Sequence, residues 1–191
     1  MQRFLDAAFE LMDEKGTTDF TIQEVVGCSK QSLRAFYRFF DGKDHLLLAL
    51  FEETVREAVE DIGAAVADES DPVKRLRAFV IRLHEWCEPP QTPRKRGAHN
   101  RHPTSEFSVQ LALDHPERMR EAMAPIGRML VGLVDDAVAA KAIKVSDTRR
   151  AATLIQQTVM FSWFGNRLVQ NAKMRVTAEQ TWDFCFRGLR G

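Results

Sequence analysis

The spacing of hydrophobic residues along the chain predicts an all-α protein. Apolar positions recur every three to four residues, as one buried face of a helix requires, and convincing strand alternation is almost absent. The expected helices span residues 2–14, 22–26, 32–40, 43–68, 72–87, 104–113, 116–142, 146–171 and 177–189.

Several residues in the first part of the chain are expected to mark helix ends. Gly16 stops the first helix, since glycine adopts the left-handed conformation that often closes helices. Thr21, with Glu24 three residues later, forms a capping-box pattern, and Ser32 is a second N-cap candidate. Asp71 followed by Pro72 opens a later helix. The first fifty residues therefore hold three short helices separated by turns.

Residues 29–43, "SKQSLRAFYRFFDGK", concentrate positive charge in a chain with 27 basic and 27 acidic residues. The segment carries four basic residues and one acidic residue, interleaved with aromatic side chains. It is either an amphipathic helix with a solvated face or a local surface for a polyanion. Three phenylalanines can anchor it from beneath: Phe36, Phe39 and Phe40.

Two short helices joined by a turn, the second of them basic, resemble a helix-turn-helix. Arg34 and Arg38 are four residues apart and share a helix face. An arginine can bind guanine with two hydrogen bonds in the major groove, whereas tyrosine, threonine and lysine suit phosphate oxygens. The predicted DNA-contact set is Thr21, Gln31, Ser32, Leu33, Arg34, Ala35, Tyr37, Arg38 and Lys43.

Residues 3–50 resemble the DNA-binding domain of the tetracycline-repressor (TetR) family. The stretches that carry the resemblance are "RFLDAAFELMDEKG", "FTIQEVVGCSKQSLRAFYRFF" and "GKDHLLLAL". The rest of the chain matches the family only in helix number and length. The resemblance implies an all-α homodimer that represses transcription and releases DNA when a small molecule binds.

This chain departs from the family pattern at several positions. Lys30 stands where the family often has glycine, at a cost of about 1 kcal/mol if it is left-handed. Leu33, Arg34 and Ala35 replace residues that are frequently basic, small and hydroxylated, respectively. The family often has a basic arm before the first helix, whereas this chain starts at that helix, so an arm is expected to have been lost or trimmed.

Composition favours a soluble, cytoplasmic protein. The three cysteines are far apart and odd in number, which is typical of a reduced compartment. No apolar run reaches the roughly 20 residues of a membrane span, so no membrane partner is expected. Paired nucleophiles, phosphate-binding glycine loops and zinc-protease spacings are not evident, so an enzyme is not expected and no cofactor is implied.

The later helices hold aromatic and methionine positions that pack in a core or line a cavity for a lipophilic effector. This predicted effector set is Phe79, Leu83, Trp86, Phe107, Leu111, Met119, Met123, Met129, Met160, Trp163 and Phe164. His84, Cys87, His99 and His102 make a weak metal pattern, and no metal site is predicted. The basic cluster at 94–101 is interpreted as a surface loop, with contact to DNA or an acidic partner as the alternative.

The sequence therefore predicts a helix-turn-helix domain at residues 1–45 and an effector-binding and dimerisation domain at residues 46–191. The last two helices are expected to pair with their copies in a homodimer. The small residues expected at that interface are Ala151, Ala152, Thr158, Ser162 and Gly165. The predicted function is a ligand-responsive repressor bound to a double-stranded, pseudo-palindromic operator. The alternatives are a helical protein–protein interaction module without DNA binding, and a regulator without a ligand cavity.

Overall fold

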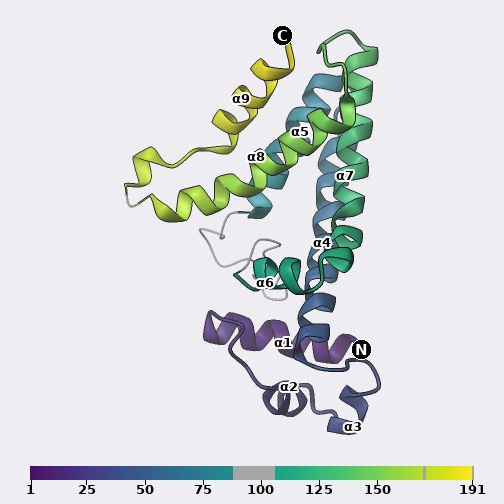
Figure 1. Ribbon diagram of the computed structural model, residues 1–191, viewed down its shortest axis with the longest axis vertical. Helices are drawn as coiled ribbons and strands as arrows, with labels where there is room; N and C mark the ends of the chain where they lie inside the picture. Colours follow the sequence, from purple (N-terminus) through teal and green to yellow (C-terminus); the bar gives the residue numbers. More distant parts are fainter. Residues whose placement is uncertain (88–105, 170, 191) are drawn as a thin grey trace. The chain divides into compact units, whose positions relative to one another are not determined.

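All regular structure in the described part of the chain is helical, which confirms the all-α prediction (Figure 1). The computed structural model describes residues 1–87, 106–169 and 171–190, apart from the side chains at 106, 107, 163 and 167. The helices are α1 (Gln2–Lys15), α2 (Ile22–Ser29), α3 (Leu33–Phe36), α4 (Lys43–Ala67), α5 (Pro72–Cys87), α6 (Glu106–Asp114), α7 (Pro116–Ala139), α8 (Thr148–Leu168), the 3-10 turn η1 (Ala172–Met174) and α9 (Ala178–Arg190).

The chain divides into two compact units. Unit 1 comprises Met1–Thr54 with Pro90–Ala122, and unit 2 comprises Val55–Pro89 with Met123–Gly191. Helices α4 and α7 each contribute their first turns to unit 1 and their remainder to unit 2. The predicted boundary between a DNA-binding domain at residues 1–45 and an effector-binding and dimerisation domain at residues 46–191 concerns function, and it stays a prediction.

An aromatic cluster forms the core of α1–α3 in unit 1. The ring centroid of Phe4 lies 5.5 Å from that of Phe36 and 6.2 Å from that of Phe40, and the Phe36 and Phe40 centroids are 5.2 Å apart. All three side chains are almost completely buried. Burial of large aromatic surface supplies the packing that short helices need, since helices of this length are not stable alone in water.

The predicted helix ends of unit 1 are confirmed at three positions. Gly16 closes α1 with a φ of 66°. Thr21 and Glu24 form the capping box at the start of α2, and the Ser32 hydroxyl accepts a hydrogen bond from the Ala35 amide at 3.1 Å. Each such cap contributes about 1 kcal/mol to helix stability.

The basic helix is shorter than predicted. Helix α3 ends at Phe36, and a tighter turn follows, in which the Phe39 amide donates to the Phe36 carbonyl at 2.9 Å. This turn directs Phe40 into the core and leaves the Phe39 side chain 42% exposed. The Phe39 ring centroid still lies 6.4 Å from those of Phe4 and Phe40, so Phe39 anchors this segment in part, whereas Phe36 and Phe40 do so fully.

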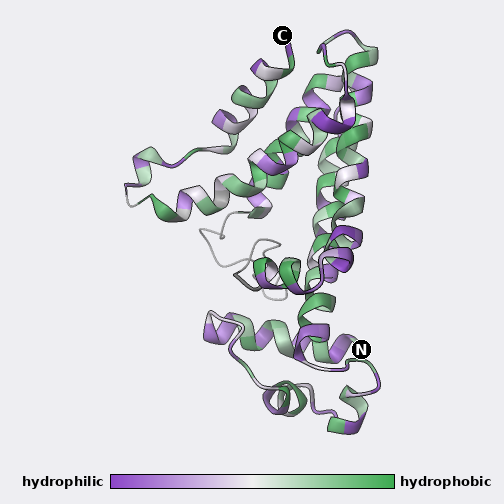
Figure 2. Cartoon of the chain, viewed as in Figure 1, coloured by the Kyte–Doolittle hydropathy of each residue, from purple (hydrophilic) through white to green (hydrophobic). Residues whose placement is uncertain are grey.

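In unit 2, α5 packs against both α8 and α9. Arg75 of α5 binds Asp136 of α7 at 2.7 Å, and the Trp86 indole donates to Asp61 of α4 at 2.8 Å. Figure 2 shows hydrophobic and hydrophilic residues interleaved along these helices, as amphipathic packing requires. Among the described helices, none has an apolar stretch long enough to cross a bilayer.

Candidate nucleic-acid interface

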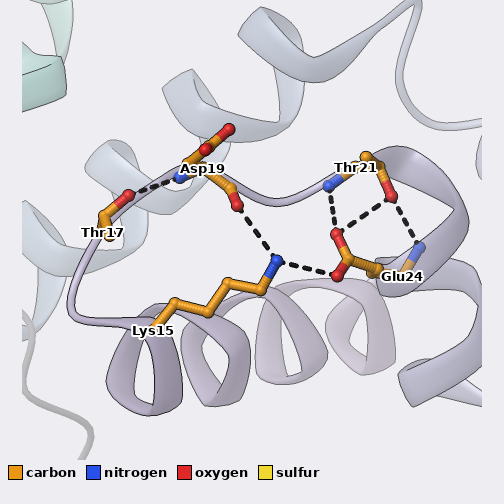
Figure 3. Close-up of polar contacts among 5 residues, drawn as sticks. All are labelled: Lys15, Thr17, Asp19, Thr21 and Glu24. Carbon is orange, nitrogen blue, oxygen red and sulfur yellow. Dashed lines mark hydrogen bonds and ion pairs between the residues drawn. The ribbon is translucent and has the colours of Figure 1, made fainter.

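A polar network fixes the start of α2 against the end of α1 (Figure 3). The Lys15 ammonium binds the Glu24 carboxylate at 2.7 Å and the Asp19 carbonyl at 3.0 Å. The other Glu24 oxygen accepts hydrogen bonds from the Thr21 amide at 2.7 Å and the Thr21 hydroxyl at 3.0 Å. The hydrogen bond from Lys15, followed by those from Thr21, lowers the pKa of Glu24 to about 2.

The turn between α2 and α3 depends on a left-handed lysine. Lys30 has φ 54° and ψ 34°, which confirms the conformation considered from its place in the turn. Its amide donates to the Gly27 carbonyl at 3.2 Å, and the Gln31 amide donates to the Val26 carbonyl at 3.3 Å. These bonds close α2 at a conformational cost of about 1 kcal/mol for a residue with a side chain.

The face of α3 away from the aromatic core carries free positive charge. Phe36 is fully buried, whereas Arg34 and Arg38 are exposed. Among the residues that the structure describes, neither guanidinium has a hydrogen bond or an ion pair. Because α3 ends at Phe36, Arg38 lies in the turn after the helix, and the prediction that the two arginines share a helix face is wrong. Two guanidinium groups without a carboxylate partner, four residues apart in the chain, still suit an external anion.

Two further predicted contact residues have defined neighbours. The Tyr37 side chain is 54% exposed, and its ring stands edge-on to Phe36 with centroids 5.5 Å apart. The Lys43 ammonium lies 4.9 Å from the centroid of the buried Phe20 ring. Sequence reasoning did not assign Phe20 a part here, because the approach of residues 20 and 43 depends on the tertiary fold.

The nine predicted DNA-contact residues all lie in unit 1. Six are exposed: Thr21, Ser32, Leu33, Arg34, Tyr37 and Arg38. Three are half-buried: Gln31, Ala35 and Lys43. Because the Thr21 hydroxyl already donates to Glu24, a phosphate would have to compete for it. The role of the whole set in DNA binding stays a prediction.

From its place next to the turn, the sequence favours Cys28 as a small buried hydrophobic residue over a redox sensor, and the expected burial is wrong. It is exposed at the end of α2, and its thiol donates to a Glu10 carboxylate oxygen at 3.2 Å. Partial burial, and then the hydrogen bond to Glu10, raise the pKa of the Cys28 thiol. A raised thiol pKa lowers the thiolate fraction, so Cys28 is a poor nucleophile at neutral pH.

The structure does not bring the predicted effector residues together in one unit. Leu111 and Met119 belong to unit 1. The described side chains of the set in unit 2 are Phe79, Leu83, Trp86, Met123, Met129, Met160 and Phe164. Phe164 is 53% exposed in the single chain, and the part of the set in effector binding stays a prediction. The side chains of Phe107 and Trp163 lie outside the described residues.

Unit 2 has an open groove of about 970 Å³ between α8 and α9. Leu154 and Phe184 are large exposed apolar residues on its walls, and Arg150 and Asp183 are charged residues there. Ala151 and Ala152 are buried within the single chain, and Ala151 also lines this groove. Their expected part in a dimer interface stays a prediction.

The weak metal pattern is not assembled in the described part of the chain. His84 and Cys87 are buried on α5, whereas His99, His102 and the basic cluster at 94–101 lie outside the described residues. Within the described ranges, no group of three or more histidine, cysteine or acidic side chains is placed to hold a metal ion.

Comparison with known proteins identifies relatives of the first part of the chain. Residues 4–50 match the family described as "Bacterial regulatory proteins, tetR family". The "HTH-type transcriptional regulator BetI" of Brucella anthropi is 28% identical over 79 residues, which cover 41% of this chain and 41% of that protein. The chain thus spans about two fifths of the length of the curated relative.

Solved structures with low sequence identity share the fold of the whole chain. A TetR transcription regulator from Haloarcula marismortui has a TM-score of 0.75 at 18% identity, covering 100% of this chain and 97% of that one. The transcriptional regulator FadR from Bacillus subtilis, in complex with stearoyl-CoA, has a TM-score of 0.67 at 13% identity, covering 100% and 97%. These similarities establish an all-α fold with a helix-turn-helix region and a larger helical body.

Proposed function

From the match of residues 4–50 to the tetR family of bacterial regulatory proteins, we propose that the protein is a member of this family and a transcriptional repressor. It binds a pseudo-palindromic operator in double-stranded DNA as a homodimer and leaves it when a small lipophilic effector binds. Residues 1–45 contact the DNA, and residues 46–191 bind the effector and form the dimer. The protein works in the cytoplasm, and it is a regulator rather than an enzyme.

The observation that carries this proposal is the pair of exposed, unpaired guanidinium groups of Arg34 and Arg38, in α3 and the turn after it. In the described residues, Arg34 on α3 and Arg38 in the turn after it have no carboxylate partner, and buried Phe36 anchors the segment that carries them. An α-helix fits the major groove, where arginine distinguishes guanine from other bases. Tyr37 and Lys43 lie on the same segment and supply phosphate contacts, which orient the helix without reading sequence.

The exposed apolar face of α8 and α9 supports a dimer. Leu154, Phe161 and Phe184 are exposed by 58%, 71% and 70% in the single chain. Leu154 and Phe184 line the same groove, and large exposed apolar side chains gathered in this way are typical of a protein interface. Arg150 and Asp183 beside it have opposite charges, which a two-fold axis can bring together in two equivalent pairs. Symmetric association then presents two copies of α3 to successive major grooves, about 34–36 Å apart.

The effector part of the proposal rests on coupling between sites. The DNA-binding state of the dimer holds its two α3 helices at the spacing of successive major grooves. A ligand that binds better to a state with another spacing lowers the affinity for DNA. Bound DNA lowers the affinity for the ligand by the same factor. The stearoyl-CoA complex of the FadR structure is one reason to begin with lipophilic compounds. A ligand at 100 times its dissociation constant adds about 2.7 kcal/mol to folding stability, which a thermal-shift screen detects.

Footprinting on DNA selected from a random pool tests the function. The expected result is protection of two half-sites about 10 base pairs apart from centre to centre, by a species that sediments as a dimer or as a pair of dimers. Addition of a compound found in the thermal-shift screen should remove the protection. A chain that selects no sequence from the pool would contradict the proposal and favour a protein-interaction module.

A further inference from the structure

Leu33 is an exposed aliphatic residue next to the exposed arginines of this segment. Its side chain is 42% exposed at the first position of α3, directly before the exposed Arg34. Phe36 and Phe40 supply the buried anchors of this segment. Leu33 therefore leaves a large part of its surface in water, beside the guanidinium pair.

The backbone at this position is held in place. The Ser32 hydroxyl caps α3 through the Ala35 amide at 3.1 Å, and the Tyr37 amide donates to the Leu33 carbonyl at 3.1 Å. Leu33 and Tyr37 are four residues apart and share a helix face. The leucine side chain therefore projects from a backbone position that hydrogen bonds hold in place.

Only one base edge in the major groove matches an aliphatic side chain. Thymine presents its C5 methyl group there, whereas guanine, adenine and cytosine present hydrogen-bond donors and acceptors. A leucine placed against those polar atoms would remove water without replacing its hydrogen bonds, which is unfavourable. Against the thymine methyl it buries apolar surface on both sides.

We propose that Leu33 reads the C5 methyl group of one thymine in each half-site of the operator. This inference rests on the proposed function, because it concerns how the same surface chooses its DNA sequence. It adds an apolar reading position beside the guanidinium pair, so the preferred half-site contains a required thymine.

Replacement of thymine by deoxyuridine tests the inference, since it removes only the methyl group. Each thymine of the selected operator is replaced in turn, symmetrically in both half-sites, and affinity is measured by fluorescence anisotropy. At one thymine, the loss of the methyl group should weaken binding by about fourfold per half-site, the factor that corresponds to one buried carbon. In Leu33→Ala this sensitivity should vanish, and in Leu33→Met it should persist.

Arg34→Ala is the matched control, because it alters the neighbouring side chain and leaves the leucine in place. It should bind the operator more weakly and still respond to deoxyuridine at the same thymine. The inference is overturned if every thymine tolerates deoxyuridine in the wild type, or if folded Leu33→Ala keeps the full sensitivity. Absence of any sequence-selective DNA binding would overturn the proposed function together with it.

Discussion

Arginines in two regions of the molecule have opposite surroundings. In unit 2, Arg75 binds Asp136 at 2.7 Å, and Arg82 binds Asp61 at 3.2 Å and Glu85 at 3.0 Å. In unit 1, Arg34 of α3 and Arg38 in the turn after it have no carboxylate partner among the described residues. Arginine side chains thus form ion pairs within unit 2, whereas those of Arg34 and Arg38 in unit 1 leave their charge available to another molecule.

The placement of acidic residues explains this difference. Residues 29–43 contain one carboxylate, Asp41, and it lies 3.5 Å from His45 Nδ1. Unit 2 instead places acids one or two turns from its arginines or on adjacent helices. Exposed ion pairs of the unit 2 kind contribute only about 0–1 kcal/mol each to stability. The contrast is therefore expected to matter more for DNA affinity than for folding.

Loss of the anchor beneath the free arginines should have the largest effect. Phe36→Ala removes a fully buried ring and should lower the free energy of unfolding by about 3–5 kcal/mol. Phe39→Ala, at a ring that is 42% exposed, is the matched control and should cost much less. Urea denaturation followed by circular dichroism measures both, and equal losses would contradict the packing described for α3.

Removal of one free guanidinium should weaken DNA binding while leaving the fold intact. Arg34→Ala should cost about 1–3 kcal/mol of operator affinity and relax base preference at one position. Arg75→Ala, which removes a paired arginine, should bind the operator as the wild type does. Gel-shift titrations on operator and random DNA compare them. If Arg34→Ala matches the wild type on both DNAs, the two regions do not differ as described.

Glycine at position 30 should stabilise the turn between α2 and α3. Lys30→Gly removes the strain of a left-handed residue and should raise the free energy of unfolding by about 1 kcal/mol. Lys30→Ala keeps a β-carbon and the strain, so it should bring no such gain. Thermal denaturation of the two variants tests this, and equal midpoints would argue against strain at Lys30.

Protonation of Glu24 at low pH should break the hydrogen bonds at the start of α2. The resulting loss of stability is the smallest effect expected. Because the pKa of Glu24 is lowered to about 2 in the folded chain, its ionised form stabilises the fold above its ordinary pKa of about 4.3. That contribution is lost as the pH falls from about 4 towards 2. Glu24→Gln should flatten the loss of stability in this range, as measured by denaturation at pH 6, 4 and 2.5. Lys15→Met, which removes the main donor, should shift the loss to higher pH.

Much of the fold follows from local sequence. The apolar spacing predicts every long helix, and Thr21, Ser32 and Gly16 mark ends that the structure confirms. These features depend on residues within one or two helical turns of each other. They are therefore readable without knowledge of the tertiary contacts.

The features that the sequence did not predict depend on residues far apart in the chain. The bond between Lys15 and Glu24 requires α1 and α2 to meet at a particular angle, and the approach of Lys43 to Phe20 requires α4 to return to the same place. The apolar effector set could not be separated from core residues, because both kinds of position select the same side chains. Only tertiary structure assigns its members to separate units and Phe164 to the surface.

The salt dependence of operator affinity tests the central claim most directly, with the wild type and the double variant Arg34→Ala/Arg38→Ala measured side by side. For the wild type, the logarithm of affinity should fall steeply and linearly with the logarithm of salt concentration, with a slope of about −0.9 per neutralised phosphate. The folded double variant should lose its preference for operator over random DNA. A wild-type affinity that did not change with salt concentration would contradict the account, as would a double variant that preferred operator over random DNA as strongly as the wild type does.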